Sequence, residues 1–377
     1  MRRLRVLACV GLLGGLMAGP GGADAASAAC ASGGLHAYYP GWTQIDVPPF
    51  APRDDIDRPL QPITDYAVDQ GDKKRLFVTN GQSLLRSADS GCTWKKVYQS
   101  SLPRAIDYPP SNILVSAPGG NRVYMLVTTG YPTSDVGTIQ FFASTDGGST
   151  FTEKDSGFLP LGAQQLVTTP ADPKRVYLLS AYTDRAYGFV LQTSSDGGAT
   201  WKQQNSPTAP LAGMTSVFMT VDSTDPNFIT MWGAKGAAQK TGVFRSTDAG
   251  ATLTEIGAGI TAAGRNGMSI VHPKGGPSEL LFTNATNLFG CNADCTLNGS
   301  LKSPKKVIEV LARGGTTRAW LIGNDNLGVG VFRYDRGSQT YVSSLPEADA
   351  VDLRLGGPGS NAVYVRTPAT IFRYEGR

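Results

Sequence analysis

Three carboxylates and one arginine are the residues of this chain whose types and positions could support chemistry. Asp65, Glu309 and Asp352 fall at the same position when the short apolar segments around them are aligned, and Arg354 follows Asp352 on the same face. Crowded carboxylates can bind a cation, or one can keep a raised pKa and act as a general acid or base. Strands that line a hydrated channel also tolerate charge without any chemistry, and we favour that simpler interpretation.

Other catalytic or cofactor chemistry has little support. His36 lies in an N-terminal leader and His272 precedes a proline in an expected turn, so a Ser-His-Asp triad is not expected. No Gly-rich phosphate loop follows a strand and opens a helix, which argues against a nucleotide. We therefore expect no cofactor. A cation bound by the three carboxylates, in a channel that their strands would line, is the one metal-binding alternative that we leave open.

The elements that must position these residues are marked by a recurring octapeptide, Ser-x-Asp-x-Gly-x-Thr-Trp. Two copies match fully and two carry Phe or Leu in place of Trp. Their aspartates, separated by 57, 50 and 52 residues, are Asp89, Asp146, Asp196 and Asp248. A short Asp side chain accepts backbone N–H hydrogen bonds within a tight turn, and Gly supplies the positive φ that such a turn needs.

Short segments rich in Val, Leu, Phe and Thr precede each octapeptide and are bounded by Gly, Pro, Asp and Asn. This pattern predicts antiparallel strands joined by hairpins, and a period near 50 residues is in the range of propeller blades. Less regular copies follow the clear ones. Cys291 to Cys295 occupy the place of one octapeptide, a worn copy lies at 335–337, and the last unit ends before a fourth strand.

The octapeptide resembles the Asp-box, or bacterial neuraminidase repeat, of β-propellers such as sialidases, xyloglucanases, sortilin-type receptors and photosystem-assembly propellers. The resemblance covers about half of the chain by clear copies and nearly all of it by degenerate ones. It implies that each octapeptide joins the third and fourth strands of a blade, away from the ligand-binding mouth. We expect an all-β, seven-bladed propeller of four-stranded antiparallel blades, as one domain over residues 26–377.

An open propeller would expose unpaired strand edges, so the missing fourth strand of the last blade must come from elsewhere. Residues 41–45, Gly-Trp-Thr-Gln-Ile, have strand-forming character and are expected to pair beside 370–374 and close the ring. Closure would bring Cys30 close to the turn that holds Cys92, and we expect a disulfide between them. A second disulfide, Cys291–Cys295, is expected to clamp the fifth unit locally.

The first 25 residues have the features of a secretory signal peptide. A basic start precedes a short apolar run and the small-residue sequence Ala-Asp-Ala at 23–25. Removal of this segment leaves four cysteines, an even number that suits disulfides in an extracellular protein. Zinc is not expected because no histidine lies near them. No stretch is long enough to span a membrane, so we expect a secreted protein.

The formal net charge of +4 is spread along the chain, and no Lys/Arg run alternates with aromatics, so nucleic acid is not an expected partner. Inserts at 130–137, 181–187 and 233–240 each separate the second and third strands of a blade and therefore share one face. Their tyrosines suit contact with protein or glycan, although solvated loops fit equally well. We expect a monomeric, non-catalytic protein that binds extracellular proteins or glycans.

The alternative is a glycoside hydrolase of sialidase or xyloglucanase type that uses the channel carboxylates. An inverting enzyme would need two carboxylates about 6.5–9.5 Å apart, which Asp65 and Glu309 could supply. The sialidase pattern also implies an Arg-Ile-Pro motif, and this chain has none; Arg58-Pro59 is the nearest sequence.

The export signal and length also resemble extracellular actinobacterial propellers of the dispase-autolysis-inducing type. That resemblance implies a protein that modulates a protease and serves as a glutamine donor for transglutaminase. If it holds, glutamines in flexible turns are the accessible donors: Gln44, Gln70, Gln82 and Gln339.

Overall fold

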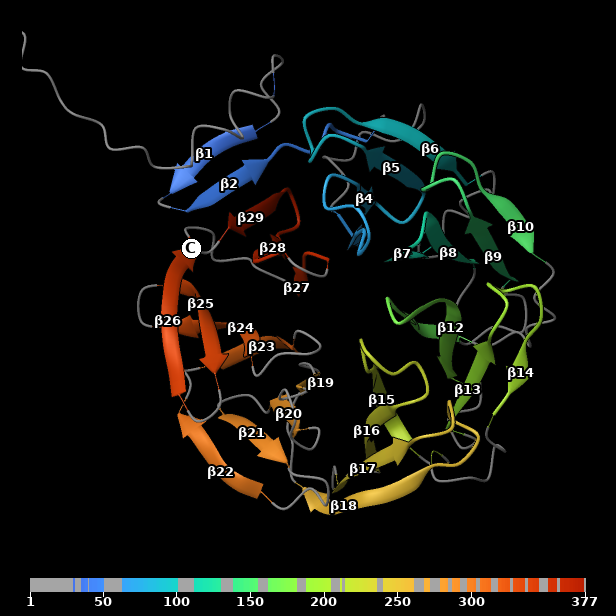
Figure 1. Ribbon diagram of the computed structural model, residues 1–377, viewed down its shortest axis with the longest axis vertical. Helices are drawn as coiled ribbons and strands as arrows, with labels where there is room; N and C mark the ends of the chain where they lie inside the picture. The colour runs from blue at the N-terminus through green and yellow to red at the C-terminus, as the bar shows by residue number, and fades with distance from the viewer. Residues whose placement is uncertain are drawn as a thin grey trace, which may run out of the picture.

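The computed structural model describes residues 30, 35–39, 41–50, 63–100, 112–129, 138–154, 162–181, 188–204, 211, 214–235, 240–260, 268–271, 279–283, 287–291, 297–302, 306–312, 318–325, 328–335, 338–345, 352–357 and 360–375. Within these ranges the regular elements are strands, which form seven antiparallel sheets. The sheets are arranged around a common centre (Figure 1). This architecture is a β-propeller with four-stranded antiparallel blades.

Six sheets each contain four consecutive strands, which run in chain order from the innermost strand outward. Sheet 1 consists of β3 (Asp65–Val68), β4 (Leu76–Thr79), β5 (Ser83–Ser87) and β6 (Lys95–Gln99). Sheet 2 consists of β7 (Asn112–Gly119), β8 (Arg122–Thr129), β9 (Thr138–Ser144) and β10 (Thr152–Lys154). Sheet 3 consists of β11 (Gly162–Thr169), β12 (Asp172–Ala181), β13 (Phe189–Ser194) and β14 (Lys202–Gln203).

The second half of the chain continues in the same way. Sheet 4 consists of β15 (Met214–Val221), β16 (Ile229–Lys235), β17 (Lys240–Ser246) and β18 (Thr254–Ile260). Sheet 5 consists of β19 (Met268–Val271), β20 (Glu279–Thr283), β21 (Asn287–Cys291) and β22 (Leu297–Lys302). Sheet 6 consists of β23 (Lys306–Ala312), β24 (Arg318–Asp325), β25 (Gly328–Asp335) and β26 (Ser338–Leu345).

Sheet 7 combines the two ends of the described chain. Its strands run outward as β27 (Asp352–Leu355), β28 (Ala362–Arg366), β29 (Ile371–Glu375), β2 (Trp42–Ile45) and β1 (Leu35–Tyr39). The N-terminal β2 pairs antiparallel with the C-terminal β29, from Trp42 opposite Tyr374 to Ile45 opposite Ile371. The segment that the sequence analysis assigns to the last sheet therefore lies in that sheet, and β1 adds a fifth strand outside it.

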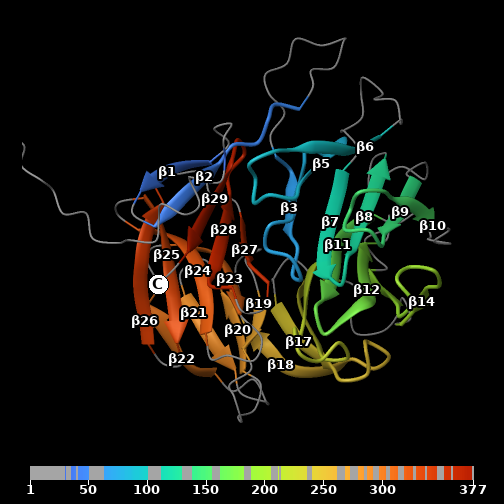
Figure 2. The ribbon, with the colours of Figure 1, turned by 45° about the horizontal axis from the view of Figure 1, so that its top comes forward.

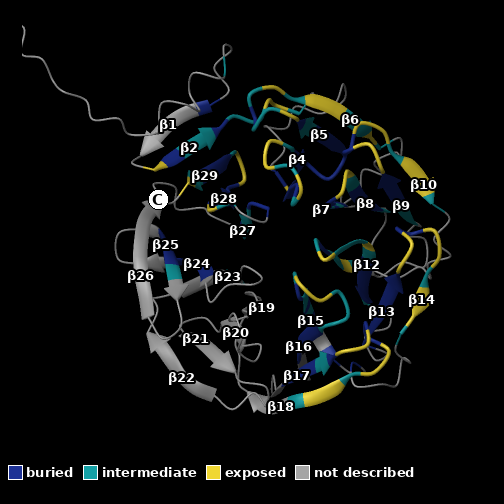
Figure 3. Cartoon of the chain, in the orientation of Figure 1, coloured by how far each residue is buried: buried dark blue, intermediate teal, exposed yellow. Residues whose placement is uncertain are grey.

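The apolar core lies between neighbouring sheets because successive side chains of a strand point to opposite faces. On β12, Tyr177 and Leu179 pack toward sheet 4, whereas Val176 and Leu178 pack toward sheet 2. All four are fully buried. Figure 3 shows the contrast with the outermost strands β6, β10, β14 and β18, where exposed residues gather. Burial on both faces explains the apolar runs that the sequence shows in the inner and middle strands.

Each of the four octapeptides links the third strand of its sheet to the fourth. In the copy at 194–201, the Ser194 hydroxyl donates to Asp196 Oδ1 (2.8 Å) and accepts the Gly198 N–H (2.8 Å). Asp196 also accepts the N–H of Thr200 (2.9 Å) and, through Oδ2, its hydroxyl (2.6 Å). The same bonds recur in the other three copies. The recurring spacing of Ser, Asp, Gly and Thr is thus the spacing of one hydrogen-bonded turn.

The glycine of this turn is also required by packing against the preceding sheet. Gly198 has a φ of 84°, and a Cβ atom there would overlap the ring of Phe141 on β9. The equivalent glycine of the second copy, Gly148, lies in the same way against Phe77 on β4. The octapeptide therefore fixes both a turn and the close approach of two sheets.

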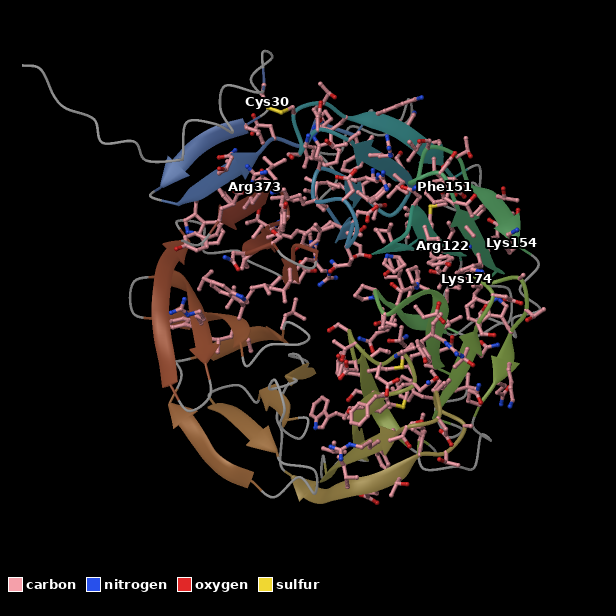
Figure 4. The ribbon with its side chains drawn as sticks, viewed as in Figure 1. Cys30, Arg122, Phe151, Lys154, Lys174 and Arg373 are labelled. Carbon is pink, nitrogen blue, oxygen red and sulfur yellow. A yellow bond between two sulfur atoms is a disulfide. The ribbon has the colours of Figure 1, made fainter. Side chains whose placement is uncertain are left out.

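Cys30 and Cys92 form a disulfide, with Cα atoms 5.4 Å apart. The bridge connects Cys30, which precedes β1 in the chain, to the octapeptide turn of sheet 1. Figure 4 shows Cys30 at the outer side of the ring. The expected Cys291–Cys295 bridge and the expected signal at 1–25 fall outside the described residues, as do 130–137 and most of the other two inserts. No helix in the described ranges is long and apolar enough to cross a membrane.

The octapeptide aspartates lead to an expectation for acid stability. Hydrogen bonds from the hydroxyl and N–H of Thr200 lower the pKa of Asp196 to about 2, and the pKa of Asp146 is lowered by Thr150 in the same way. A folded-state pKa below the ordinary value of about 3.9 stabilises the fold fully above that value, and this contribution is lost as the pH falls toward the folded pKa. We expect the stability advantage of wild type over Asp196→Asn to shrink between about pH 5 and pH 2.

The measurement is urea unfolding of both proteins across that pH range. Glu153→Gln, which removes a carboxylate of the outer strand β10, is the matched control. A difference between wild type and Asp196→Asn that stays constant down to pH 2 would contradict the assigned hydrogen bonds.

Candidate functional site

A cavity of about 500 Å³ lies at the centre of the ring, and its described lining residues come from the innermost strands of six sheets and the turns beside them. Figure 2 shows these strands, among them β3, β7, β11 and β27, facing the middle of the molecule. Among the described lining residues the charged ones are Asp65, Asp352 and Arg354, all on the neighbouring strands β3 and β27. Opposite them, β11 and β15 contribute neutral amides, hydroxyls and apolar side chains, including Gln164, Thr220 and Phe218. The charged wall is therefore the part of the cavity with potential for chemistry.

Asp65 is buried and both of its carboxylate oxygens accept hydrogen bonds from this chain. Oδ2 accepts the backbone N–H of Val115 on β7 (3.0 Å), and Oδ1 accepts Nη2 of Arg354 on β27 (3.4 Å). Burial raises the pKa of Asp65, against the opposing effects of the Arg354 charge and the Val115 N–H. One carboxylate thus connects strands of sheets 7, 1 and 2.

Asp352 is paired with an arginine that the sequence analysis does not identify. Arg366 on β28 donates from Nε to both carboxylate oxygens (3.2 Å each) and from Nη2 to Oδ2 (2.8 Å). Its Nη1 also donates to the carbonyl of Ile63, just ahead of sheet 1. Burial is the largest single effect on the pKa of Arg366 and lowers it, but the hydrogen bonds and charge of Asp352, together with the nearby Asp65 and Tyr66, raise the pKa overall. Forked pairs of this kind are among the stronger protein ion pairs.

Arg354 lies between the two carboxylates. Its Nη2 is 3.4 Å from Asp65 Oδ1 and 3.9 Å from Asp352 Oδ2, and Nη1 donates to the Leu353 carbonyl at 3.0 Å. Its guanidinium carbon stands 5.2 Å from the ring centre of Tyr66, which favours a cation–π contact. The guanidinium therefore occupies the space in which a catalytic water or a bound cation would have to meet both carboxylates.

A neutral residue performs the same task as Asp65 elsewhere in the ring. Gln165 on β11 accepts the backbone N–H of Met219 on β15 through its side-chain oxygen (2.7 Å). The first strand of each sheet has an open edge toward its neighbour, and a buried N–H left there without a partner costs about 1–3 kcal/mol. Asp65 and Gln165 each avoid that cost by accepting a backbone N–H of the next innermost strand. This recurrence supports a structural explanation for Asp65.

The structure brings together three of the four residues singled out in the sequence: Asp65, Asp352 and Arg354. Glu309 lies on β23 with its backbone opposite Ile322, and its side chain is outside the described part of the chain. Arg366 was missed because its partner depends on the register of β27 with β28, where Asp352 lies opposite it. The sequence did contain a signal for this pair. Asp352 begins the first strand of the last repeat unit and Arg366 ends the second, and a hairpin brings these two strand ends together.

The proposed glutamine donors are not all in accessible turns, which corrects that expectation. Gln44 lies in β2 and Gln339 in β26, and both residues are paired with a neighbouring strand. Gln82 is buried with only 7% of its surface exposed. The Gln70 amide does follow a strand, but it donates to the carbonyls of Val68 (3.2 Å) and Leu355 (3.1 Å). Gln70 therefore connects sheets 1 and 7.

No protein-family model and no curated protein matches the sequence. Among solved structures, the chain is similar to YCF48 bound to D1 peptide, with 14% identity, a TM-score of 0.57 and coverage of 90% of this chain and 98% of that one. The likeness is one of fold. The chain is also similar to virginiamycin B lyase from Staphylococcus aureus, with 13% identity, a TM-score of 0.56 and coverage of 84% of this chain and 96% of that one. An ancestral GH74 enzyme has 13% identity and a TM-score of 0.52, with coverage of 83% of this chain and 44% of that one. These neighbours include both a peptide-binding protein and enzymes.

The Asp352–Arg366 pair allows a direct test of the structural explanation. Arg366→Gln leaves the Asp352 carboxylate without its forked partner, and we expect a loss of about 2–4 kcal/mol in the free energy of unfolding. The double variant Asp352→Asn/Arg366→Gln removes the stranded charge and should recover part of that loss.

Urea unfolding of both variants measures these changes, with Lys202→Gln on the exposed strand β14 as the control for loss of one positive charge. Additive losses in the double variant would mean that the two side chains do not interact.

Proposed function

We propose that this chain is a secreted, non-catalytic propeller of seven Asp-box blades, closed by β2, that binds an extended segment of another extracellular protein in its central cavity. The observation that carries the proposal is the state of the channel carboxylates. Asp65 and Asp352 are both engaged by arginines and a backbone N–H of the same chain. Carboxylates held in this way serve as structural parts of the cavity wall, which favours binding over acid–base catalysis.

The seven blades and their closure are supported by the seven sheets and by the pairing of β2 with β29. The four octapeptide turns support the Asp-box assignment, since all four use the same Ser, Asp, Gly and Thr contacts. The disulfide between Cys30 and Cys92 is in keeping with an oxidising, extracellular location.

The lining of the cavity supports a peptide as the ligand to test first. Neutral amide and hydroxyl groups, among them Gln164, Thr168 and Thr220, alternate there with apolar side chains such as Leu166 and Met219. Such a surface can hydrogen-bond a peptide backbone while it accepts uncharged side chains. YCF48, one of the structures with this fold, is described with a bound D1 peptide, which motivates the choice.

A glycoside hydrolase remains as a second candidate because of one observation. The pKa of Asp65 is raised by burial, and a raised carboxyl pKa is what a general acid requires. Asp65→Asn and Glu309→Gln are the variants that test it on a panel of fluorogenic glycosides. Turnover by the wild type that both variants abolish would overturn the binding proposal.

The binding proposal itself predicts an effect of filling the cavity. We expect wild type to bind members of a fluorescent 12-residue peptide library, and Gln164→Trp to weaken the tightest of them at least about tenfold, or about 1.4 kcal/mol. Gln164 is an exposed residue of the cavity lining, so the larger ring takes up space that a ligand would occupy.

Fluorescence anisotropy measures this binding, and Gln203→Trp on the exposed outer strand β14 is the matched control. Equal affinity of wild type and Gln164→Trp would contradict a site in the cavity. Absence of binding to the whole library, together with binding of a neutral oligosaccharide, would replace the peptide by a glycan.

A further inference from the structure

The junction between sheets 7 and 1 differs from the other junctions of the ring. Its two innermost strands, β27 and β3, have only four residues each, and they meet over a shorter stretch than other neighbouring innermost strands. An apolar cluster that includes Val68 and Val78 of sheet 1 and Ile371 of sheet 7 spans the junction, and polar contacts cross it as well. The Tyr66 hydroxyl donates to the Tyr364 carbonyl (3.0 Å), the Ile63 N–H to the Pro368 carbonyl (2.8 Å), and Arg354 contacts Asp65.

The N-terminal hairpin, β1 with β2, spans this junction on the outside. Its strand β2 adds to sheet 7 through β29, and Trp42 and Ile45 are almost fully buried there. The Thr370 hydroxyl donates to the Ile45 carbonyl at 2.8 Å, which holds the end of β2 on sheet 7. The hairpin is therefore the outer part of sheet 7 although the chain continues from it into sheet 1.

Both ends of the hairpin are attached to one turn of sheet 1. After β2, the Asp46 carbonyl accepts Nε1 of Trp94 (3.0 Å), and Ile45 packs directly against Gly91. Before β1, the disulfide joins Cys30 to Cys92. Gly91, Cys92 and Trp94 belong to the same octapeptide. The hairpin is thus a loop anchored twice on sheet 1 and paired with sheet 7.

We propose that the Cys30–Cys92 disulfide makes this hairpin a redox-sensitive clasp across the junction. The bond closes a loop of 62 residues, so it removes conformational freedom that the hairpin would gain on leaving β29. Reduction releases the anchor ahead of β1 and leaves the anchor after β2. The oxidised protein holds the junction shut, and the reduced protein opens locally at β2 and β29.

Both sulfur atoms belong to half-buried residues, which leaves them within reach of a small reductant. A dithiol such as dithiothreitol supplies two electrons and two protons. The Cys30–Cys92 bond breaks, each cysteine becomes a thiol, and the reductant becomes its cyclic disulfide. Reoxidation reverses the step and restores the clasp.

Hydrogen exchange followed by mass spectrometry tests the proposal on the full chain. Addition of dithiothreitol should lower amide protection in β2 and β29 about 100-fold, within the usual range for loss of a disulfide that closes a long loop. Amides of β12 and β16, in sheets 3 and 4 away from the junction, serve as the internal reference and should keep their protection. A change below about threefold at β2 and β29, or an equal loss in all four strands, would overturn the clasp.

Two cysteine variants separate this bond from the other pair of cysteines. Cys30→Ser/Cys92→Ser should show the lowered protection at β2 and β29 without reductant, and dithiothreitol should add nothing. Cys291→Ser/Cys295→Ser should respond to dithiothreitol like the wild type. The reverse pattern would assign the effect to the second pair and refute the proposal. None of these readouts depends on ligand binding.

Discussion

The first strand of each sheet in this ring has one backbone edge that no other strand covers. A buried amide left there without a partner is expensive, so a side chain that reaches from one innermost strand to the next stabilises the contact between the two sheets. The Asp65 carboxylate accepts the N–H of Val115 in this way, and the Gln165 amide oxygen accepts the N–H of Met219. A hydroxyl pair, Ser116 with Thr168 at 2.7 Å, connects β7 to β11 between them.

The same requirement explains why charge gathers at one side of the cavity. The junction of sheets 7 and 1 joins the two ends of the described chain, and its innermost strands are short. Arginine can reach further than a neutral side chain and can satisfy several acceptors at once. Arg366 contacts both Asp352 and the Ile63 carbonyl, and Arg354 contacts Asp65. Ionic contacts thus add to a junction at which the two innermost strands meet over a short stretch.

Much of the fold could be predicted because its signals are local and repeated. The octapeptide encodes a turn whose hydrogen bonds lie within eight residues, so Asp89 and Asp196 could be assigned without knowledge of tertiary contacts. The place of residues 41–45 beside the last strand followed from counting strands per repeat, and Cys30–Cys92 followed from that placement. These inferences needed only the order of elements along the chain.

The site could be predicted only in part because its contacts depend on register and on neighbouring sheets. Alignment of the repeats placed Asp65, Asp352 and Arg354 together, since equivalent positions of innermost strands face one axis. It could not show that Asp352 lies opposite Arg366, or that Asp65 reaches the N–H of Val115. Gln82 was misjudged for a related reason: a residue next to glycine in a turn is still buried when another part of the fold covers the turn.

The central claim is that Asp65 connects two sheets in the same way as Gln165 does. Its most direct test is the free energy of unfolding of Asp65→Ala beside that of Gln165→Ala, measured in urea at neutral pH. The account predicts that both variants lose about 1–3 kcal/mol, because each leaves a backbone N–H of the next strand without its partner. A gain in stability for Asp65→Ala with a loss for Gln165→Ala would contradict it, since carboxylates kept for function are commonly held at the expense of stability.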